Sequence, residues 1–484
     1  MKVIDRRKLP EDRLATTDET GRRVYVFPAS VQGLYRTLRT SVQSILIVIL
    51  LVLPWIRIGG HQALLFDIVE RRFSVFGLTF WAHDGPLVFF ILALLSIGLA
   101  FITAVWGRVW CGWACPQTVF IDGIFRRIEY WVIGSHIKQR NLAQISWNGE
   151  KIFKYSIVWI LFTFVSLMVA HSFLAYFVGA ERLVQMTQHN PGQNWTIFII
   201  MAFITAVLLF DFGWFREQFC IIMCPYGRFQ SVLMDDDSIN VSYDTKRGEP
   251  RRGTVKPGEK EGDCIDCFRC VDVCPTGIDI RKGLQLECVA CTACMDACDE
   301  VMEKVERPKG LIRYASEREV SGGKSSYLRS RTLIYLVLIA VITGALAFNV
   351  SRRENIMITI LRAKDTPYQV VKEHAEDGHN VMGNEREEII NHFKVHLKNQ
   401  SFDDTTLKME LPGTWGQKGV EFITQSDAFG LNAGSNMTVH FFVKFPPDIV
   451  SEKGSKKIQI VFEDTNSGKK YSEELKLVGP GKVE

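Results

Sequence analysis

The stretch 264–275 reads CIDCFRCVDVCP, and residues 288–298 repeat its cysteine spacing as CVACTACMDAC. Each run has the form C-x2-C-x2-C-x3-C, a spacing typical of sites that bind iron–sulfur clusters. Three cysteines separated by two residues wrap one corner of a cubane, while the fourth points away and reaches the other cluster. The pattern therefore predicts two [4Fe–4S] clusters. We expect one to be held by Cys264, Cys267, Cys270 and Cys298, and the other by Cys288, Cys291, Cys294 and Cys274.

A pair of zinc sites is the alternative for so many cysteines. Zinc sites more often use two separated C-x2-C pairs than a four-cysteine run, so the spacing favours a two-cluster segment of the bacterial ferredoxin type. All twelve cysteines lie between Cys111 and Cys298. This clustering suits metal ligation better than a disulfide framework, and it implies a reducing compartment. We expect the chain to transfer electrons one at a time.

The composition indicates a membrane protein of several domains. The chain has 484 residues, which leaves room for about three domains. Its mean hydropathy is slightly positive although 23% of the residues are charged, so the apolar residues must be gathered in blocks. The net charge of +4 is small, and no basic face is interleaved with aromatic residues. We therefore expect no nucleic-acid partner.

Five apolar blocks are long enough to cross a membrane. Each is near the ~20 residues that a helix needs to span the hydrocarbon core, and each is nearly free of charge. Pro54 and Arg57 crowd the end of the first block, so an even number of spans, with that block peripheral, is the alternative. The blocks are 41–58, 87–106, 155–178, 195–214 and 332–350.

The distribution of Lys and Arg predicts the orientation. Residues 1–40 carry nine and residues 107–154 carry seven, whereas the segments 59–85 and 179–194 carry two and one. This alternation is the positive-inside pattern for a cytoplasmic N-terminus. It places residues 215–331 in the cytoplasm, and an odd number of spans then places the C-terminal segment in the periplasm.

The four remaining cysteines form a duplicated C-x3-C-P motif, Cys111 and Cys115 after the second block and Cys220 and Cys224 after the fourth. The spacing predicts both cysteines of a pair on one helix face, with the proline ending or kinking the helix. Both pairs fall at the cytoplasmic ends of their spans and can converge into a four-sulfur site. Soft thiolates select Cu(I), zinc or iron–sulfur chemistry, although buried cysteines are often only small apolar residues.

Several neighbouring residues admit two interpretations. Arg108 and Arg216 either lower the thiol pKa values or anchor the spans at the interface, and Met223 either adds a thioether or packs. A quinol or metal-entry site is a further interpretation for the histidines near the outer ends of the spans, which are His61, His83, His171 and His189.

The C-terminal segment reads as short β-runs separated by turns, with strands predicted at 407–411, 420–425, 437–445, 457–462 and 471–477. Several strands in about 100 residues indicate an immunoglobulin-like β-sandwich, which we expect to serve in docking. The histidines that precede the strands are expected to be ordinary surface residues; they are His374, His379, His392 and His396.

We therefore predict a multi-domain membrane protein: an α-helical bundle of five spans, a cytoplasmic ferredoxin segment and an all-β immunoglobulin-like domain. The predicted parts are a cytoplasmic N-terminal segment (1–40), a four-helix transmembrane region with the two C-x3-C-P motifs (41–214), a cytoplasmic ferredoxin domain with two [4Fe–4S] clusters (215–331), a fifth transmembrane helix (332–350) and a periplasmic immunoglobulin-like domain (351–484).

The sequences WCGWACP at 110–116 and CIIMCPYGRFQ at 220–230, with the double cluster motif and the late β-domain, resemble the cytochrome c oxidase accessory protein family. These are the CcoG/FixG/RdxA-type proteins of bacterial cbb3 oxidase assembly, and the resemblance covers essentially the whole chain. The C-x3-C-P pair alone is shared with other membrane polyferredoxins that pass quinol electrons. Asp299 departs from the usual ferredoxin pattern, in which a proline follows the last cysteine.

The resemblance implies a cupric reductase that converts Cu(II) to Cu(I) for the copper site of the oxidase. It implies that the clusters relay electrons, and that copper is bound or reduced at Cys111, Cys115, Cys220 and Cys224. It also implies membrane lipid, cbb3 oxidase assembly factors and copper transporters or chaperones as partners. The electron donor and a homo-oligomeric state are left open. The alternatives are a quinol-linked electron-transfer subunit without copper chemistry, and a structural assembly scaffold.

Overall fold

The computed structural model divides into two compact units. The first comprises residues 1–56, 64–70 and 83–350, and the second comprises 57–63, 71–82 and 351–484. Within these ranges the structure describes residues 16, 23–58, 61–68, 72–76, 78–81, 85–252, 260–352, 354–363, 366–373, 386–401, 403–451 and 454–480.

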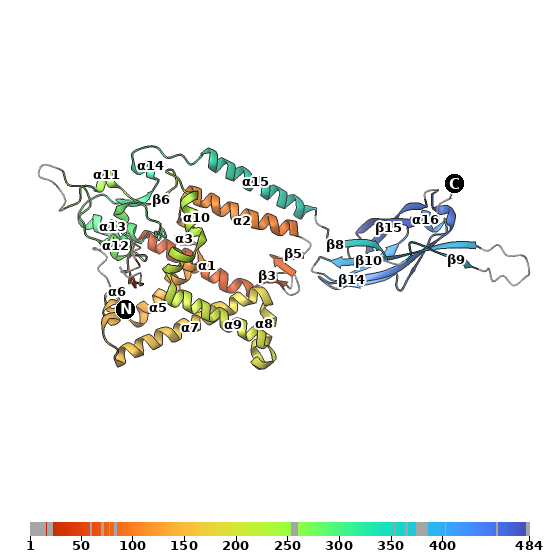
Figure 1. Ribbon diagram of the computed structural model, residues 1–484, viewed down its shortest axis with the longest axis horizontal. Coiled ribbons are helices and arrows are strands. Elements are labelled where there is room, and N and C mark those ends of the chain that lie inside the picture. Colours follow the sequence, from red (N-terminus) through yellow and green to blue (C-terminus); the bar gives the residue numbers. More distant parts are fainter. Residues whose placement is uncertain are drawn as a thin grey trace, which may run out of the picture. The chain divides into compact units, whose positions relative to one another are not determined.

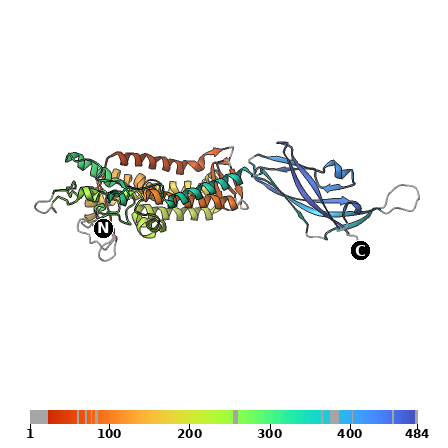
Figure 2. The same ribbon diagram turned by 90° about the horizontal axis from the view of Figure 1, so that it is seen from above.

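Five helices of the first unit are long and apolar enough to cross a membrane, as the sequence predicted. They lie lengthwise beside one another (Figures 1 and 2). Few of their side chains are buried within the protein, which leaves their apolar outer surfaces for lipid. The spans are α1 (Leu34–Val52, continued by a 3-10 turn to Trp55), α2 (Gly85–Trp106), α7 (Gly149–Val178), α9 (Trp195–Leu208, continued by the π-helix η5, Leu209–Phe215) and α15 (Ser330–Ser351).

The first and third spans begin earlier than the apolar blocks suggested. Helix α1 starts at Leu34 rather than at residue 41, so its first turns contain Arg36 and Arg39. Arg39 is buried and forms an ion pair with Asp122, which compensates its charge inside the protein. Helix α7 starts at Gly149 because the side chain of Asn148 caps it, accepting a 2.8 Å hydrogen bond from the Lys151 N–H.

Short helices connect the spans. Between α2 and α7 the chain forms α3 (Val109–Trp113), α4 (Pro116–Phe120), the π-helix η3 (Ile121–Phe125), α5 (Arg126–Val132) and α6 (His136–Gln144). The remaining ones are α8 (Ala180–Gln188) and the 3-10 turn η4 (Pro191–Gln193) before α9, and the π-helix η6 (Phe219–Met223) and α10 (Pro225–Leu233) after it.

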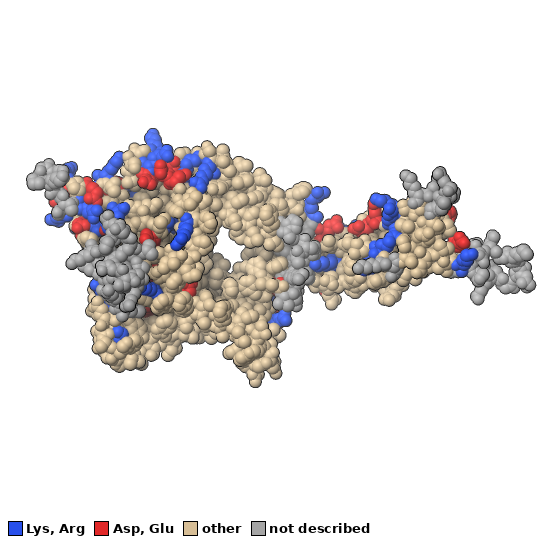
Figure 3. Space-filling model, in the orientation of Figure 1, with Lys and Arg blue, Asp and Glu red and all other residues tan. Residues whose placement is uncertain are grey.

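The ferredoxin segment follows α10 and packs at one end of the helices (Figure 1). Its buried core contains Val241, Tyr243, Met295, Met302 and Ile312. Charged side chains gather over the end that carries α14 and β6, whereas the surface over the long helices is nearly free of them (Figure 3). Its elements are the antiparallel pair β6 (Asn240–Tyr243) and β7 (Ile312–Ala315), and α11 (Thr245–Gly248), α12 (Arg269–Asp272), η7 (Ile280–Lys282), α13 (Ala293–Lys304) and α14 (Glu317–Val320).

The second unit contains the C-terminal β-domain, two antiparallel sheets around one apolar core that includes Phe393, Phe441 and Phe462. One sheet has the order β12-β14-β10-β8 with β9 also paired to β10, and the other has the order β13-β11-β15-β16. The strands are β8 (Ile356–Arg362), β9 (Gln369–Glu373), β10 (Arg386–Asn399), β11 (Thr405–Glu410), β12 (Glu421–Thr424), β13 (Ala428–Leu431), β14 (Asn436–Phe445), β15 (Ser455–Asp464) and β16 (Lys470–Val478).

The β-domain confirms the predicted sandwich, and β11, β12, β14, β15 and β16 match the five predicted strands. The sequence pattern did not predict β8, β9, β10 or β13. The longest of them, β10, is dense in charged and polar residues because one of its faces is exposed. Five short strands also occupy the connection between α1 and α2: β1 (Arg57–Ile58), β2 (His61–Gln62), β3 (Leu64–Asp67), β4 (Arg72–Val75) and β5 (Leu78–Trp81).

Candidate functional site

The two cysteine runs share a backbone conformation as well as a spacing. In each run the residues immediately before and after the middle cysteine have positive φ: Asp266 and Phe268 around Cys267, and Ala290 and Thr292 around Cys291. Left-handed residues on both sides turn the backbone sharply at the middle cysteine. Both runs therefore curl in the same way, as loops that wrap a compact group require.

The structure brings the first predicted ligand set together. Cys264, Cys267, Cys270 and Cys298 line one cavity, whose other walls are mostly apolar and include Phe268, Met302 and Leu311. Three of the cysteines come from the first run, whereas Cys298 comes from α13 at the end of the second. The guanidinium of Arg281 also lines this cavity and lies 4.3 Å from the centre of the Phe268 ring.

The second predicted set lines a second cavity. Cys288, Cys291 and Cys294 meet Cys274 there, and Cys270 contributes to the wall between the two cavities. The Ala290 N–H donates a 3.4 Å hydrogen bond to Cys288 Sγ, a contact of the kind that tunes cluster potentials. Across the described residues no three His, Cys, Asp or Glu side chains are placed to hold a single metal ion. Four thiols line each cavity, which is the number of cysteine ligands that a [4Fe–4S] cluster takes.

Burial favours the protonated form of Cys288, Cys294 and Cys298 when no metal is bound. It raises the pKa of Cys288 to about 12 and the pKa of Cys298 to about 12, and it raises the pKa of Cys294 well above its ordinary value. Metal binding must therefore displace protons from these thiols.

The membrane-side cysteines do not lie on uninterrupted helices, so the prediction of two thiols on one helix face was wrong. Cys111 lies in α3, but Cys115 is extended (ψ 126°) and Pro116 begins α4. The second motif repeats this break: Cys224 is extended (ψ 111°) between η6 and α10. A residue before proline avoids the α-helical region, and proline is well suited to the first position of the next helix.

The four membrane-side thiols nevertheless lie close together. A negative charge on Cys220 would lie within electrostatic range of Cys111, Cys115 and Cys224, and one on Cys111 within range of Cys115 and Cys224. The side-chain amide of Gln230 donates a 3.1 Å hydrogen bond to Cys111 Sγ. Burial raises the pKa of Cys111 to about 11 and also raises the pKa of Cys220.

Arg108 is part of the link between this thiol group and the ferredoxin segment, rather than an interface anchor. Its guanidinium donates to the backbone carbonyls of Leu286 and Cys288, the latter over 2.9 Å, and its charge acts on both Cys111 and Cys288. Met223 is 62% exposed, so the structure gives it no role at the thiols.

The loop between Cys111 and Cys115 packs directly on the loop that carries Cys288 and Cys291. A Cβ atom at Gly112 would lie 2.8 Å from the Val289 carbonyl oxygen and closer still to that of Ala290. The Trp113 indole donates a 3.0 Å hydrogen bond to the Tyr314 hydroxyl beside this contact. The two cysteine groups are therefore joined by direct packing of their loops.

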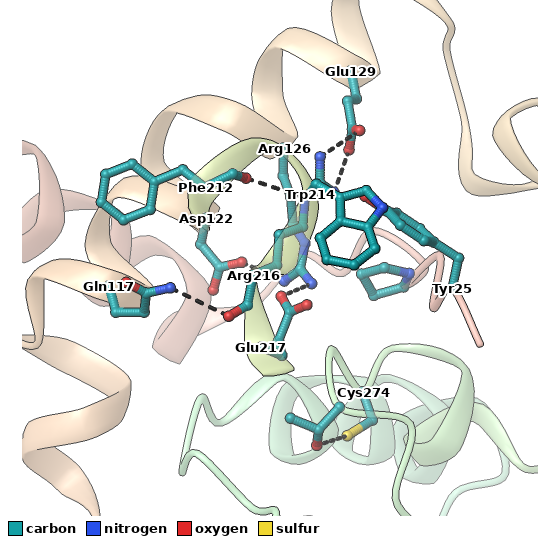
Figure 4. A network of polar contacts seen from close by, with 12 residues as sticks. Tyr25, Gln117, Asp122, Arg126, Glu129, Phe212, Trp214, Arg216, Glu217 and Cys274 are labelled. Carbon is teal, nitrogen blue, oxygen red and sulfur yellow. Dashed lines mark hydrogen bonds and ion pairs between the residues drawn. The ribbon is translucent and has the colours of Figure 1, made fainter. Parts of the chain in front are cut away.

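A buried ionic network lies beneath this contact and joins the two C-x3-C-P stretches (Figure 4). Asp122 pairs with Arg39 and with Arg126 (2.5 Å), and Arg126 also pairs with Glu217, which lies three residues before Cys220. Arg39 also donates a 2.7 Å hydrogen bond from Nε to the Gly112 carbonyl oxygen. Burial opposes ionisation of Asp122, but the guanidinium groups outweigh it and hold the pKa of Asp122 well below its usual range.

A second buried pair, Arg216 with Glu129 (2.6 Å), completes the network, so Arg216 is not an interface anchor either. The sequence drew attention to Arg216, but it did not predict the carboxylates of the network, which are Asp122, Glu129 and Glu217. The available signal was the i,i+4 spacing of Asp122 and Arg126, which suits an ion pair on one face of a helix.

The histidines do not form a metal site among the described residues. The ring of His171 stacks on Trp55, and His189 contacts the Gln185 carbonyl oxygen over 2.6 Å. His83, His374 and His379 lie outside the described residues, and the side chain of His61 is not described either. His392 and His396 belong to β10, where His392 Nε2 lies 3.0 Å from His440 Nδ1 of β14.

Comparison with protein-family models gives three matches. A "4Fe-4S dicluster domain" matches residues 215–317, and a "4Fe-4S binding domain" matches 87–138 and 193–236, the stretches that contain the two C-x3-C-P motifs. The model that describes an immunoglobulin-like fold at the C-terminus of FixG matches residues 346–480.

Curated proteins resemble the chain over most of its length. Protein RdxB of Cereibacter sphaeroides is 38% identical over 372 residues, which cover 73% of this chain and 77% of that protein. Protein RdxA of the same organism is 34% identical over 81% of this chain and 83% of its own length. The nitrogen fixation protein FixG of Rhizobium meliloti is 31% identical over a stretch that covers 80% of this chain and 79% of that protein.

Proposed function

The chain belongs to the family of FixG, RdxA and RdxB, and from this premise we propose that it is a membrane iron–sulfur reductase that converts Cu(II) to Cu(I). The observation that carries the proposal is the packing of Gly112 against Val289 and Ala290. This packing joins the loop of the membrane-side thiols to the ferredoxin segment. The proposed copper site and the proposed cluster site are therefore in direct contact through their loops.

Eight cysteines of the ferredoxin segment would hold the resident cofactors. Bound [4Fe–4S] clusters supply one-electron storage and transfer. The chain orients their ligands with the left-handed residues of each loop and excludes water with apolar walls. We assign Cys264, Cys267, Cys270 and Cys298 to one cluster and Cys274, Cys288, Cys291 and Cys294 to the other.

Copper would be the substrate at the membrane-side thiols. Thiolates are soft ligands that stabilise Cu(I) over Cu(II), which favours one-electron reduction of the bound ion. A substrate that binds and leaves does not require a rigid tetrahedral site, and the four thiols lie close together. Cys111, Cys115, Cys220 and Cys224 are the proposed copper ligands.

The proposed cellular setting follows the family resemblance. Cu(I) would be passed to the copper site of a cbb3-type oxidase, with oxidase assembly factors and copper transporters or chaperones as partners. Bacterial inner membrane is the proposed location, with the ferredoxin segment in the cytoplasm and the β-domain in the periplasm, since Lys and Arg alternate between the connecting segments.

A second candidate function is electron transfer from quinol without copper chemistry. The match of a 4Fe-4S binding model to both C-x3-C-P stretches favours it, because the same four thiols would then hold a third cluster. Iron content separates the two candidates. Two clusters require about eight irons per chain, whereas a third raises the content to about twelve.

The deciding experiment is an anaerobic titration of the reduced, cluster-loaded protein with Cu(II), followed by EPR. We expect each Cu(II) to re-oxidise the protein by one electron. Joint substitution Cys111→Ser and Cys115→Ser should abolish this re-oxidation while the iron content stays at about eight. Met223→Leu, next to Cys224, is the matched control and should behave as wild type. Full copper reduction after Ser replaces all four cysteines would refute the proposal.

A further inference from the structure

A cavity of about 290 Å³ lies between the first helix and the ferredoxin segment. Its membrane-side wall comes from α1, η3 and α5, its opposite wall comes from residues near Pro275 and Cys291, and residues 28–32 close one side. The proposed copper and cluster chemistry does not account for it. Its volume is that of a small-molecule site rather than of a packing defect.

The walls of the cavity carry an excess of positive charge. Four arginines line it, and Asp122 is the one carboxylate among the lining residues. Both oxygens of Asp122 are already taken, by Arg39 and Arg126. The four arginines are Arg36, Arg39, Arg126 and Arg127.

Two of these arginines have no carboxylate partner among the described residues. Arg127 donates only a 3.3 Å hydrogen bond to the Thr40 hydroxyl. The guanidinium of Arg36 has no hydrogen-bond partner there. It lies near enough to feel the attraction of the Asp122 carboxylate, which is already shared by two other arginines, and the repulsion of Arg39 and Arg127. Arg126 adds a buried Nε–H without a partner in the described chain. Like charges gathered in one partly buried cavity are unfavourable unless an anion balances them.

We propose that this cavity binds a phosphate group. Guanidinium groups present planar forks of N–H donors that match phosphate oxygens, and several arginines around one cavity are a recurrent way to bind them. Bound phosphate would pair with Arg36 of α1 and Arg127 of α5 and so connect the two helices. It would also place negative charge beside Cys291. The site would thus join the membrane helices to the ferredoxin segment and tune its redox behaviour.

Two kinds of compound can supply the phosphate group. One is the headgroup of an anionic phospholipid, since basic pockets between transmembrane helices bind such lipids, and Trp131 at the cavity rim is 82% exposed, as interfacial tryptophans are. The other is a soluble phosphate compound. The proposal concerns the phosphate site, and it stands independently of copper reduction.

The test uses the full-length, cluster-loaded protein, freed of lipid in detergent. Inorganic phosphate is compared with chloride at equal ionic strength, and nanodiscs of phosphatidylglycerol are compared with nanodiscs of phosphatidylcholine. Thermal unfolding reports binding, and an EPR redox titration reports the cluster potentials. We expect phosphate, phosphatidylglycerol or both to raise the unfolding temperature and to lower the potential of one cluster.

Single substitutions of the cavity arginines test whether phosphate binds in this cavity. Arg36→Gln and Arg127→Gln should each weaken phosphate binding about tenfold, because each removes a charge-assisted hydrogen bond. Arg127→Lys keeps the positive charge but lacks the planar fork of N–H donors. Its phosphate affinity should lie between that of the wild type and that of Arg127→Gln. Arg140→Gln, on the exposed face of α6, is the control and should bind as wild type. A response to phosphatidylglycerol alone identifies a lipid, and a response to phosphate alone identifies a soluble compound. No response to either, or equal responses in all variants, would overturn the proposal.

Discussion

Gly112 and Ala290 approach so closely that a Cβ atom on Gly112 would overlap the carbonyl group of Ala290. The two residues lie in the middle of cysteine motifs that are far apart in the sequence: Gly112 between Cys111 and Cys115, and Ala290 between Cys288 and Cys291. Any side chain at position 112 must therefore push the two thiol-bearing loops apart.

Gly112→Ala should slow electron transfer between the two cysteine groups without removing iron. We expect a loss of stability of about 1–3 kcal/mol from overpacking, and a lower rate of Cu(II)-dependent re-oxidation in stopped-flow absorbance. Gly98→Ala is the matched control, because its added methyl group meets open space within α2. Wild-type re-oxidation kinetics in Gly112→Ala would show that the loop contact does not limit transfer.

The exchange of one cysteine between the two runs predicts which substitutions share a phenotype. Cys264→Ala and Cys298→Ala should damage the same cluster, whereas Cys274→Ala should resemble Cys288→Ala. Each variant should retain about four irons in the undamaged cluster, and EPR spectra of the reduced proteins distinguish the pairs. Spectra in which Cys298→Ala matches Cys288→Ala would contradict the assignment.

Asp122→Asn should destabilise the protein strongly, because it leaves Arg39 and Arg126 buried without their shared carboxylate. Removing one partner of a buried pair costs about 3–5 kcal/mol. Thermal unfolding in detergent measures the effect. Glu150→Gln breaks an exposed i,i+4 pair with Lys154 and should leave the unfolding temperature unchanged. Equal unfolding temperatures for the two variants would mean that the network contributes nothing to stability.

The alternation of basic residues predicts which side of the membrane each part faces. Alkaline phosphatase fused after Leu411 should be active, since the enzyme folds only in the periplasm, and a fusion after Lys309 should be inactive. Reporter activity in intact cells is the measurement. The opposite pattern, or activity at both positions, would reject the orientation.

The sequence predicted those features that depend on spacing and composition. Cysteines at fixed intervals and apolar blocks of about 20 residues are local signals, and they led to the ferredoxin segment and the five helices. The wrapping of a cubane also predicted that Cys264 and Cys298 lie together, and both line one cavity in the structure.

Features that depend on tertiary contact were not predictable in the same way. The start of α1 at Leu34 depends on Asp122, which lies more than eighty residues away and compensates Arg39. The two prolines did predict that the helix ends or kinks near each motif, and the break falls at Cys115 and Cys224 because a residue before proline avoids the α-helical region. The arginine cavity had no sequence signal, because its walls come from four separate segments.

The first turn of α1 is completed by a residue that is synthesised much later. The Asp296 carboxylate accepts hydrogen bonds from the backbone N–H groups of Tyr35 (3.2 Å) and Arg36 (2.7 Å), across a sequence separation of 261 and 260 residues. At bacterial translation rates Asp296 leaves the ribosome on the order of tens of seconds after α1. During that interval the N–H groups of Tyr35 and Arg36 lack their hydrogen bonds to Asp296. The first span can therefore complete its hydrogen bonds at Tyr35 and Arg36 only after α13 has been synthesised and has folded against it.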